Sequence, residues 1–439
     1  MCIPNVLSLE LFINFAHYRC SSYRGEVAPV DTAKAFLHNP TVIPLFALAH
    51  FAHHVLTALI VPLLPNIRNE FGLNYAQTGV VSAAFTVAYG VSQLPAGWLS
   101  DRVGPRTLLV VGISGVAVVG AFVGLVHSYL AISIVFLLMG IAGGGYHPSA
   151  SALISSRVSA DRRGRALGIH IIGGSTSYFV APLIAAGLVS LVGWRGSFVS
   201  LSIPVFILGA VVFLLLRKHT GAGRKKTPSG NQAGNEQGEN QEAGHSIAHI
   251  VTFLIFTGII GALVASTISF IPLLLVDQFD ASVELASALL AIIYGSGFWA
   301  APLGGHISDR VGQVKTMAVV GIAFGPVIIG LTFAPNLAMA CAAMFALGIL
   351  MFVRMPTAES YVAHAVPAKM RSTVLGIYFF SGMEGSALLT PILGAIIDAR
   401  GFEAGFVLLG TSMLIVALIC SAVLFKLRKR SDTEPAAFV

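Results

Sequence analysis

Long apolar stretches alternate with short polar segments along the chain, from about residue 41 almost to the C-terminus. Each stretch is about 20 residues long, the length that a helix needs to cross the hydrocarbon core of a bilayer. Twelve such stretches predict an all-α polytopic membrane protein with six spanning helices in each half of the chain. The predicted spans lie near residues 41–64, 77–99, 107–126, 129–151, 166–190, 196–216, 248–276, 283–304, 315–333, 337–358, 373–397 and 404–425.

The same pattern divides the chain into five segments. An N-terminal cytoplasmic extension (1–40) precedes a six-helix bundle (41–217), and a cytoplasmic linker (218–247) leads to a second bundle (248–426) and a cytoplasmic tail (427–439). The linker is rich in Gly, Asn, Gln and Glu and has no apolar periodicity, which is typical of a flexible, solvated connection. We therefore predict two helical halves joined by a flexible segment.

The two predicted bundles repeat each other at an offset of 208 residues. The sequence GWLSDRVG at 97–104 matches GHISDRVG at 305–312 in six of eight positions. Because each half has an even number of spans, both repeats have the same orientation in the membrane. Parallel six-helix repeats are typical of secondary transporters, in which the substrate site lies between the halves near the membrane midplane.

The composition excludes soluble enzymes, secreted disulfide scaffolds and disordered proteins. Charged residues make up 10% of the chain, against about a quarter in a typical soluble domain. The four cysteines form no Cys-x-x-Cys pair, so neither disulfides nor a cysteine-bound zinc ion is predicted. The chain has no G-x-S-x-G, H-E-x-x-H or G-x-x-x-x-G-K-[ST] motif. We predict that the protein is not an enzyme and uses no cofactor.

The positions of the basic residues explain the net charge of +7. With both termini in the cytoplasm, the cytoplasmic segments contain 22 Lys and Arg, and the external loops contain three, Arg68, Arg195 and Arg400. This asymmetry follows the positive-inside rule. It predicts a multi-pass protein of the cell (plasma or inner) membrane with both termini cytoplasmic, in contact with lipid and not with nucleic acid.

The segment GWLSDRVGPRTLL at 97–109 resembles the loop 2–3 signature of the major facilitator superfamily, with Pro105 as a departure. A weaker second copy lies at 305–315. Together with the repeat and the linker, the resemblance covers about 41–426 and implies the major facilitator fold of two parallel six-helix repeats. The matching positions are Gly97, Leu99, Asp101, Arg102, Gly104, Arg106 and Leu109 in the first copy and Gly305, Ile307, Asp309, Arg310, Gly312 and Lys315 in the second.

This signature predicts a gate between the two halves. Its glycines permit close packing and unusual backbone angles. Asp101 is expected to lie against the positive N-terminal end of a helix from the other half, where neighbouring arginines complete an ion network that forms in one conformation and breaks in the other. The alternative is that these charges only set the topology. The predicted gating residues are Gly97, Asp101, Arg102, Gly104, Arg106, Asp309 and Arg310.

Two further signatures bear on the kind of transporter. Phe136 stands where proton-coupled drug exporters of the family have an Arg, and the segment from Gly173 only loosely resembles the signature of the antiporters. The run from Gly145 to Pro148, with the histidine-rich first span, is similar to fosmidomycin-resistance-type members. An antibiotic exporter therefore stays open as an alternative.

A histidine-rich stripe marks the first span. His50, His53, His54 and Thr57 lie at i, i+3, i+4 and i+7, so they share one helical face. Polar side chains in a span normally face the bundle interior or an aqueous cavity. Substrate or proton contact and hydrogen-bonded packing both remain open for this stripe. A metal site would need a third ligand beside His50 and His54, and no carboxylate or Cys accompanies them on this span, so we assign no metal.

The family resemblance implies that spans 1, 4, 7 and 10 line a central cavity. The histidine stripe is then expected to meet residues of spans 4 and 10. The cavity residues assigned on this basis are His50, His53, His54, Thr57, Tyr146, His147, Tyr294 and Arg354, and Tyr89, Gln93, His170 and Tyr178 are further candidates.

Two charged residues inside spans carry the remaining predictions. Arg354 in span 10 is either an anchor for an anionic substrate, since a guanidinium binds a carboxylate with two parallel hydrogen bonds, or it reaches to the cytoplasmic interface. Glu384 lies near the middle of span 11, where a carboxyl group must be protonated, paired or in contact with water. We assign proton coupling to Glu384, with His54 as the alternative carrier and packing as the structural alternative. Glu359 is interpreted as structural.

Taken together, these features predict a monomeric secondary active transporter that moves a small polar or anionic organic solute by alternating access, coupled to protons. A multidrug or antibiotic efflux proton antiporter is the alternative within transport. A non-transporting membrane sensor or receptor and an integral-membrane enzyme are the alternatives from other classes.

Overall fold

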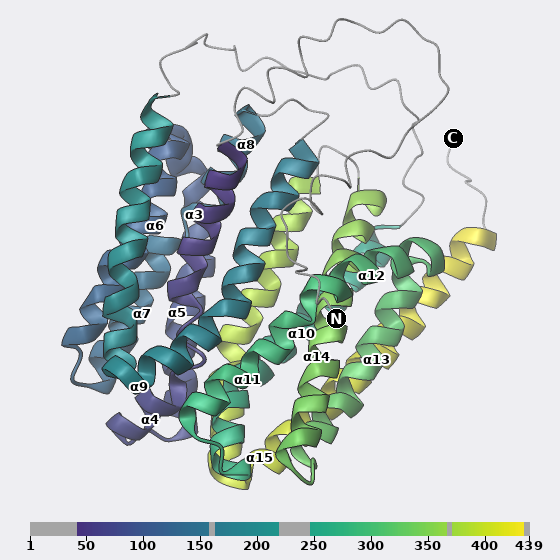
Figure 1. The fold of residues 1–439 in the computed structure, drawn as a ribbon. Helices are drawn as coiled ribbons and strands as arrows, with labels where there is room; N and C mark the ends of the chain where they lie inside the picture. Colours follow the sequence, from purple (N-terminus) through teal and green to yellow (C-terminus); the bar gives the residue numbers. More distant parts are fainter. Residues whose placement is uncertain (1–41, 158–162, 219–245, 367–370, 434–439) are drawn as a thin grey trace, which may run out of the picture. The chain divides into compact units, whose positions relative to one another are not determined.

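The computed structural model describes residues 42–157, 163–218, 246–366 and 371–433 (Figure 1). The predicted N-terminal extension (1–40), residues 219–245 of the predicted linker and residues 434–439 of the predicted tail lie outside the described residues. The start of the predicted tail, up to Thr433, continues the last helix.

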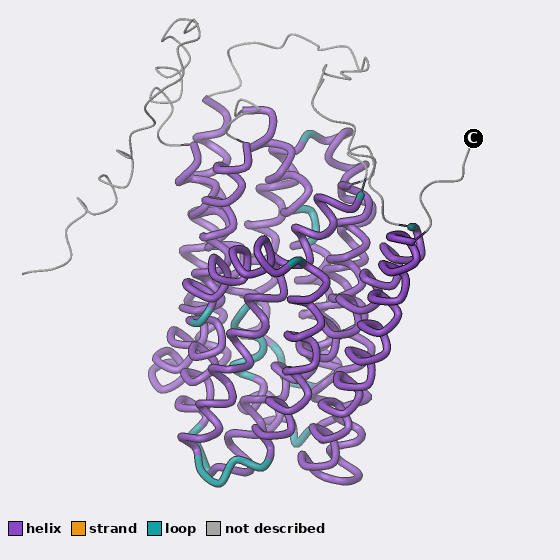
Figure 2. Tube along the Cα trace, turned by 90° about the vertical axis from the view of Figure 1, so that its right-hand side faces the viewer, coloured by secondary structure: helices purple, strands orange, loops and turns teal. Residues whose placement is uncertain are grey.

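Within the described residues, the regular structure is entirely helical, and short loops join the helices (Figure 2). The helices of the first half are α3 (Val42–Thr57), α4 (Leu64–Phe71), α5 (Tyr75–Val103), α6 (Pro105–Phe122), the 3₁₀ helix η2 (Val123–Leu125), α7 (Tyr129–Gly143), α8 (Tyr146–Arg157) and α9 (Arg163–Lys218). Those of the second half are α10 (Ile247–Phe279), α11 (Val283–Gly295), α12 (Gly297–Val311), α13 (Gln313–Thr332), α14 (Leu337–Ala365) and α15 (Arg371–Thr433).

Eight stretches of the described chain are long and apolar enough to cross a membrane. The stretches in α9 and α15 each hold two spans, because the backbone leaves the helical conformation at Gly193 in α9 and at Gly401 in α15. The helices α3 and α5 are not among the eight, and they complete the twelve predicted spans. α3 ends at Thr57 and passes into a turn at 58–63, where the carbonyl of Pro62 accepts a hydrogen bond of 2.8 Å from Ser287 on α11.

The internal repeat is also visible in the backbone. Six described residues have a positive φ, and they form three pairs, each separated by 208 residues. In the loop signature and its second copy, the left-handed φ of Gly104 (87°) and Gly312 (97°) is a conformation that a side chain disfavours. The three pairs are Gly72 and Asp280, Gly104 and Gly312, and Gly193 and Gly401.

The two halves pack along α5 and α15 and along α9 and α11, all within one compact unit. Glycines allow the backbones of α5 and α15 to approach closely, as is common between membrane helices. A Cβ atom added at Gly79 would lie 2.9 Å from the Cα of Pro391, and one added at Gly394 would lie 2.6 Å from the backbone carbon of Tyr75. The contact between these halves therefore depends on positions without a side chain.

Large apolar side chains are exposed on the outside of the helices, as expected for a surface in contact with lipid. Leu94 is 66% exposed, Leu191 78% and Leu388 70%. Buried aromatic residues, in contrast, fill the interior, among them Phe46, Phe136, Phe198, Phe253 and Phe406.

Candidate functional site

The stripe predicted on the first span is buried against neighbouring helices. His50, His53, His54 and Thr57 all lie on α3, and none is more than 7% exposed. Polar groups that are buried among helices need hydrogen-bond partners. The partners of this stripe come from α5, α6, α8 and α9, which lie far from α3 in the sequence.

A break in the fourth span directs two more side chains toward α3. Gly144 and Gly145 form a turn between α7 and α8, and Tyr146 and His147 begin α8. Tyr146 is fully buried, and a Cβ atom at Gly112 of α6 would lie 3.0 Å from the Cβ of Tyr146. The small residue on α6 thus leaves room for α8 to come close to α3.

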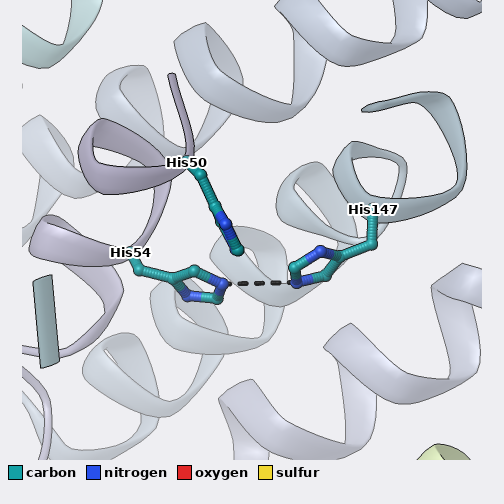
Figure 3. A group of neighbouring side chains, drawn as sticks. All are labelled: His50, His54 and His147. Carbon is teal, nitrogen blue, oxygen red and sulfur yellow. Dashed lines mark hydrogen bonds between the residues drawn. The ribbon is translucent and has the colours of Figure 1, made fainter. Parts of the chain in front are cut away.

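Five imidazoles meet there, and we call them the histidine cluster: His50, His53, His54, His147 and His170. The Nε2 atoms of His54 and His147 lie 3.2 Å apart (Figure 3). His50 Nδ1 donates a hydrogen bond of 2.8 Å to the backbone carbonyl of His170, and the two rings stack with centroids 4.2 Å apart. His170 in turn donates from Nδ1 to the carbonyl of Phe46 over 3.0 Å.

His53 has partners for both ring nitrogens. Its Nδ1 lies 3.3 Å from the carbonyl of Gly112, and its Nε2 lies 3.1 Å from the hydroxyl of Tyr89 on α5. The ring also stacks on Tyr146, with centroids 4.3 Å apart. His53 is therefore held by hydrogen bonds and packing inside the first half.

Aromatic residues connect the histidine cluster with the second half of the chain. The hydroxyl of Tyr178 on α9 lies 3.3 Å from His54 Nδ1, and the rings of Tyr178 and Tyr294 are 5.5 Å apart. Tyr294 belongs to α11, in the second half. The fold thus brings together seven of the eight predicted cavity residues, all except Arg354, with Tyr178 as the connecting residue.

Arg354 lies on α14 and is only 9% exposed. Its Nη1 donates a hydrogen bond of 3.2 Å to the carbonyl of Thr257 on α10, and Tyr378 on α15 is a second neighbour. Its Nε has no partner among the described residues. The described contacts of Arg354 are with α10 and α15 of its own half, so its predicted meeting with the histidine stripe stays a prediction.

Glu384, the predicted proton carrier, lies on α15, but its side chain is outside the described residues. Glu359 on α14 is half-buried and has a charge interaction with Arg354, and its structural role stays an expectation. The assignment of proton coupling to Glu384 or His54 therefore stays a prediction.

The structure describes part of the loop signature, and its gating role stays a prediction. Gly104 has the unusual backbone angles that were expected, whereas the surroundings of Gly97 and Asp101 on α5 are outside the described residues. No ion network of Arg102 and Arg106 is present among the described side chains. Arg102 stacks over Trp98 one turn earlier, with its guanidinium carbon 4.0 Å from the ring centroid.

Arg106 contacts its own half, and the charged residues of the second copy of the signature are exposed. Arg106 packs over the ring of Phe213 on α9 and donates a hydrogen bond of 3.1 Å to its carbonyl, so it is held inside the first half. Asp309 and Arg310 are exposed. The described contacts of Arg102 and Arg106 therefore lie within the first half.

Sequence reasoning missed a polar inter-half contact at the opposite end of α5. Arg68 on α4 forms an ion pair with Asp277 on α10, and the hydroxyl of Tyr75 donates to Asp277 over 2.7 Å. Asp398 on α15 accepts hydrogen bonds of 2.8 Å from the backbone N–H groups of Tyr75 and Ala76. The signal was present as acidic residues at the ends of spans 7 and 11, but a topology argument weighs only Lys and Arg.

A second ion pair stabilises the same end within the first half. Arg195 forms an ion pair with Glu70, and the Trp194 indole donates to Glu70 over 2.5 Å. Burial raises the pKa of Glu70, but the hydrogen bonds from Arg195 and Trp194 outweigh this and hold the pKa below its usual range. Arg195 also donates to the carbonyl of Val126. It therefore links the bend of α9 to α4 and to the loop before α7.

Comparison with known proteins gives the wider context. The chain matches the family model of the Major Facilitator Superfamily over residues 46–267 and 250–438. It is 23% identical to the glycerol-3-phosphate transporter of Bacillus subtilis (strain 168), over 93% of this chain and 97% of that protein. It is 25% identical to the multidrug resistance protein MdtG of Proteus mirabilis (strain HI4320), over 80% of this chain and 87% of that protein. A match of 32% identity to the probable L-galactonate transporter of Escherichia coli (strain K12) spans about a third of either protein, 34% of this chain and 33% of the other.

Solved structures agree in fold. A bacterial homolog of the human lysosomal transporter Spinster superposes with a TM-score of 0.74 at 17% identity, over 91% of this chain and 99% of that chain. The nucleoside transporter NupG superposes with a TM-score of 0.67 at 15% identity, over 88% of this chain and 99% of that chain. The family model accounts for nearly all of the described residues, and the chain belongs to the Major Facilitator Superfamily of membrane transporters.

Proposed function

We propose that the protein is a secondary active transporter that moves a small organic anion across the cell membrane by alternating access, coupled to protons. It works as a monomer with both termini in the cytoplasm, and it carries its solute unchanged, so no residue is assigned a catalytic role. The buried guanidinium of Arg354 is the observation that carries the anionic substrate class.

Arg354 has N–H donors that are available to an anionic substrate. A guanidinium stays charged in proteins and has five N–H donors. The ion pairs among the described residues join Arg68 to Asp277 and Arg195 to Glu70, so Arg354 forms no close ion pair within that part of the chain. Its charge interaction with Glu359 on the same helix acts over a longer distance. Its Nε is buried and unpartnered among the described residues. A buried charge without an ionic partner is costly, and a bound carboxylate, sulfonate or phosphate would lower that cost.

The relatives support the same substrate class. L-galactonate, sulfoacetate, glycerol-3-phosphate and cis,cis-muconate give their names to four similar transporters, and all four are anions. They differ in size and in the kind of acid group. A positively charged side chain can bind any of these acid groups, so it fits this set better than a pocket shaped for one compound.

Alternating access is supported by the repeat and by the polar inter-half contact. The contact joins the halves at one end of α5, where Asp398 and Asp277 are held by the first half. At the opposite end, the described arginines of the loop signature contact their own half. Such an asymmetry is what one of two alternating conformations requires. For the driving force, the absence of a nucleotide-binding motif in the sequence and the carboxyl group of Glu384 within span 11 favour a proton gradient.

The test of the anionic substrate uses purified protein in liposomes and a panel of small carboxylates, sulfonates and phosphate esters, with and without an imposed pH gradient. We expect uptake of at least one acid, faster with the gradient. Arg354→Lys keeps the charge but loses the planar fork, so it should weaken substrate affinity about tenfold, and Arg354→Gln should weaken it further. Arg400→Gln, at an exposed position, is the matched control and should leave affinity unchanged. Equal affinity in all four proteins would reject Arg354 as the anion anchor.

A multidrug or antibiotic efflux antiporter is the second candidate. Two MdtG proteins are 25% identical to this chain over most of its length, and the similarity of the segment around His147 to fosmidomycin-resistance-type members points the same way. Transport of cationic or neutral drugs by the same liposomes, without transport of any acid in the panel, would favour this candidate.

A further inference from the structure

Three imidazoles of the histidine cluster bring a ring nitrogen each into one small region. His50 and His54 come from α3 and His147 from α8, and one ring nitrogen of each lies within 4.8 Å of the other two (Figure 3). The ring centroids form a nearly equal triangle, with sides of 4.9, 5.1 and 5.2 Å. The first span alone offers two of these ligands, and the fold adds the third.

The other nitrogen of His50 is already occupied. Its Nδ1 donates to the carbonyl of His170, so the proton of the neutral ring is on Nδ1 and the lone pair is on Nε2. This Nε2 is buried and has no partner among the described residues. A backbone carbonyl that fixes the tautomer and aims the lone pair is the usual outer support of a metal-binding histidine.

His54 has hydroxyl groups rather than a backbone carbonyl beside its Nδ1. The hydroxyl of Thr57 donates its proton to the carbonyl of His54 over 3.2 Å, and the same oxygen lies 3.4 Å from His54 Nδ1. This oxygen and the hydroxyl oxygen of Tyr178, 3.3 Å from the same nitrogen, can both accept a hydrogen bond from Nδ1. In the tautomer with the proton on Nδ1, the lone pair of His54 lies on Nε2, which faces His147 Nε2 at 3.2 Å.

The geometry fits a tetrahedral ion. A zinc ion bound at 2.0–2.1 Å by nitrogen places neighbouring ligand atoms ~3.3 Å apart and imidazole centres about 5 Å apart. The 3.2 Å between the Nε2 atoms of His54 and His147 and the three centroid distances already match these values. A shift of the His50 ring would therefore complete three-coordination. A hydrogen bond between His54 and His147 would explain their short distance, but it leaves the lone pair of His50 buried without a partner.

We propose that His50, His54 and His147 form a binding site for a divalent first-row transition metal ion such as Zn²⁺, with a fourth position open to water or an anion. Three imidazoles without a carboxylate favour these ions over Mg²⁺ or Ca²⁺, which prefer oxygen ligands. The proposal departs from the expectation drawn from the sequence, which assigned no metal because the third ligand was not on the first span. It does not depend on the identity of the transported solute.

The test is isothermal titration of Zn²⁺ into full-length protein that is purified without a polyhistidine tag and stripped with a chelator. We expect one equivalent of tight binding, and a rise in the unfolding temperature when the ion is added. His50→Gln, His54→Gln and His147→Gln should each weaken binding about tenfold or more. Replacing Zn²⁺ by Co²⁺ should produce the visible absorption bands of a tetrahedral site, and these should be lost in the same variants.

Two controls separate this site from other histidines. His53→Gln removes an imidazole of the same cluster whose nitrogens contact Gly112 and Tyr89, and His249→Gln removes a buried imidazole of the second half, so both should bind Zn²⁺ as the unmodified protein does. Gly174→Ala keeps all three ligands, but its methyl group would lie 2.5 Å from His50 Cε1 and should weaken binding by displacing the ring. It serves as the test variant if a glutamine variant fails to elute as a single species. Absence of a stoichiometric site, or equal weakening by His53→Gln and His147→Gln, would overturn the proposal.

Discussion

The carboxylate of Asp398 accepts a hydrogen bond of 2.8 Å from the backbone N–H of Tyr75, the first residue of α5. Its second oxygen accepts one of the same length from Ala76. The first turn of a helix has unpaired N–H groups and a partial positive charge, so a carboxylate is stabilised there. This is the device that the loop signature predicts for Asp101, observed at the other end of α5 with a residue of the second half.

Asp398→Asn should weaken the contact between the two halves at the start of α5. The amide keeps one acceptor oxygen but loses the charge. We therefore expect the conformation that contains this contact to be destabilised by about 1–3 kcal/mol. Electron spin resonance between labels at the exposed positions His127 and Glu403 should report a longer or broader distance. Asp277→Asn should act in the same direction by breaking the ion pair with Arg68. An unchanged distance in both variants would mean that the contact does not control the conformation.

Asp101→Asn should lower transport far more than it lowers substrate binding. The side chain is predicted to act on the equilibrium between two conformations, and a bias of about 1–3 kcal/mol is enough to matter. Initial uptake rates and binding affinity measured on the same preparation separate the two effects. Asp309→Asn, at the exposed equivalent position in the second half, should have the smaller effect. Equal transport by Asp101→Asn at equal protein content would reduce the signature to a topology signal.

Glu384→Gln should keep substrate exchange and lose accumulation driven by a pH gradient. Glutamine resembles the protonated carboxyl group, so the variant can change conformation but cannot release a proton. Counterflow and gradient-driven uptake in the same liposomes measure the two activities. Glu403→Gln is the control, since it changes an exposed carboxylate of the same helix, α15. Normal accumulation in Glu384→Gln would move the coupling role to another group, with His54 the next to be tested.

Labelling of single cysteines tests the orientation. In a cysteine-free background, a cysteine at Ser229 in the predicted linker should react only with reagents that reach the cytoplasm. A cysteine at the exposed Pro335, between α13 and α14, should react from outside. The expectation rests on 22 basic residues against three. The opposite accessibility would mean that the predicted orientation in the membrane is wrong.

The ion pair of Glu70 makes the stability of the first half depend on pH. Because its pKa is held below the usual value, the folded state favours the ionised carboxylate, and this contribution is complete above the usual pKa of Glu, ~4.3. It is lost as the pH falls through the lower pKa of the folded state. Glu70→Gln should therefore lower the unfolding temperature at pH 7 and lose that difference at low pH. Since the carboxylate is 42% exposed, the effect should be about 1 kcal/mol or less.

Glu403→Gln, which changes an exposed carboxylate at the same end of the molecule, is the control for this experiment. It should leave the unfolding temperature unchanged at both pH values. A difference between Glu70→Gln and the unmodified protein that persists at low pH would mean that packing, rather than charge, sets the effect.

The sequence by itself determined the spans, the repeat and the family, because these depend on features that are linear along the chain. Apolar length predicts a spanning helix wherever it occurs, and the match between 97–104 and 305–312 carries the symmetry that reappears as Gly104 and Gly312 in the backbone. The stripe of His50, His53 and His54 is also local, since it follows from the helical period alone.

The tertiary structure alone decided which of these side chains meet. His50 contacts His170 across 120 positions, and Tyr75 contacts Asp398 across 323. Such pairs depend on how helices pack and on small residues such as Gly79 that let them approach, and neither is encoded in the periodicity of one segment. For the same reason, Arg354 could be recognised as a charge inside a span, but its hydrogen bond to Thr257 on α10 could not.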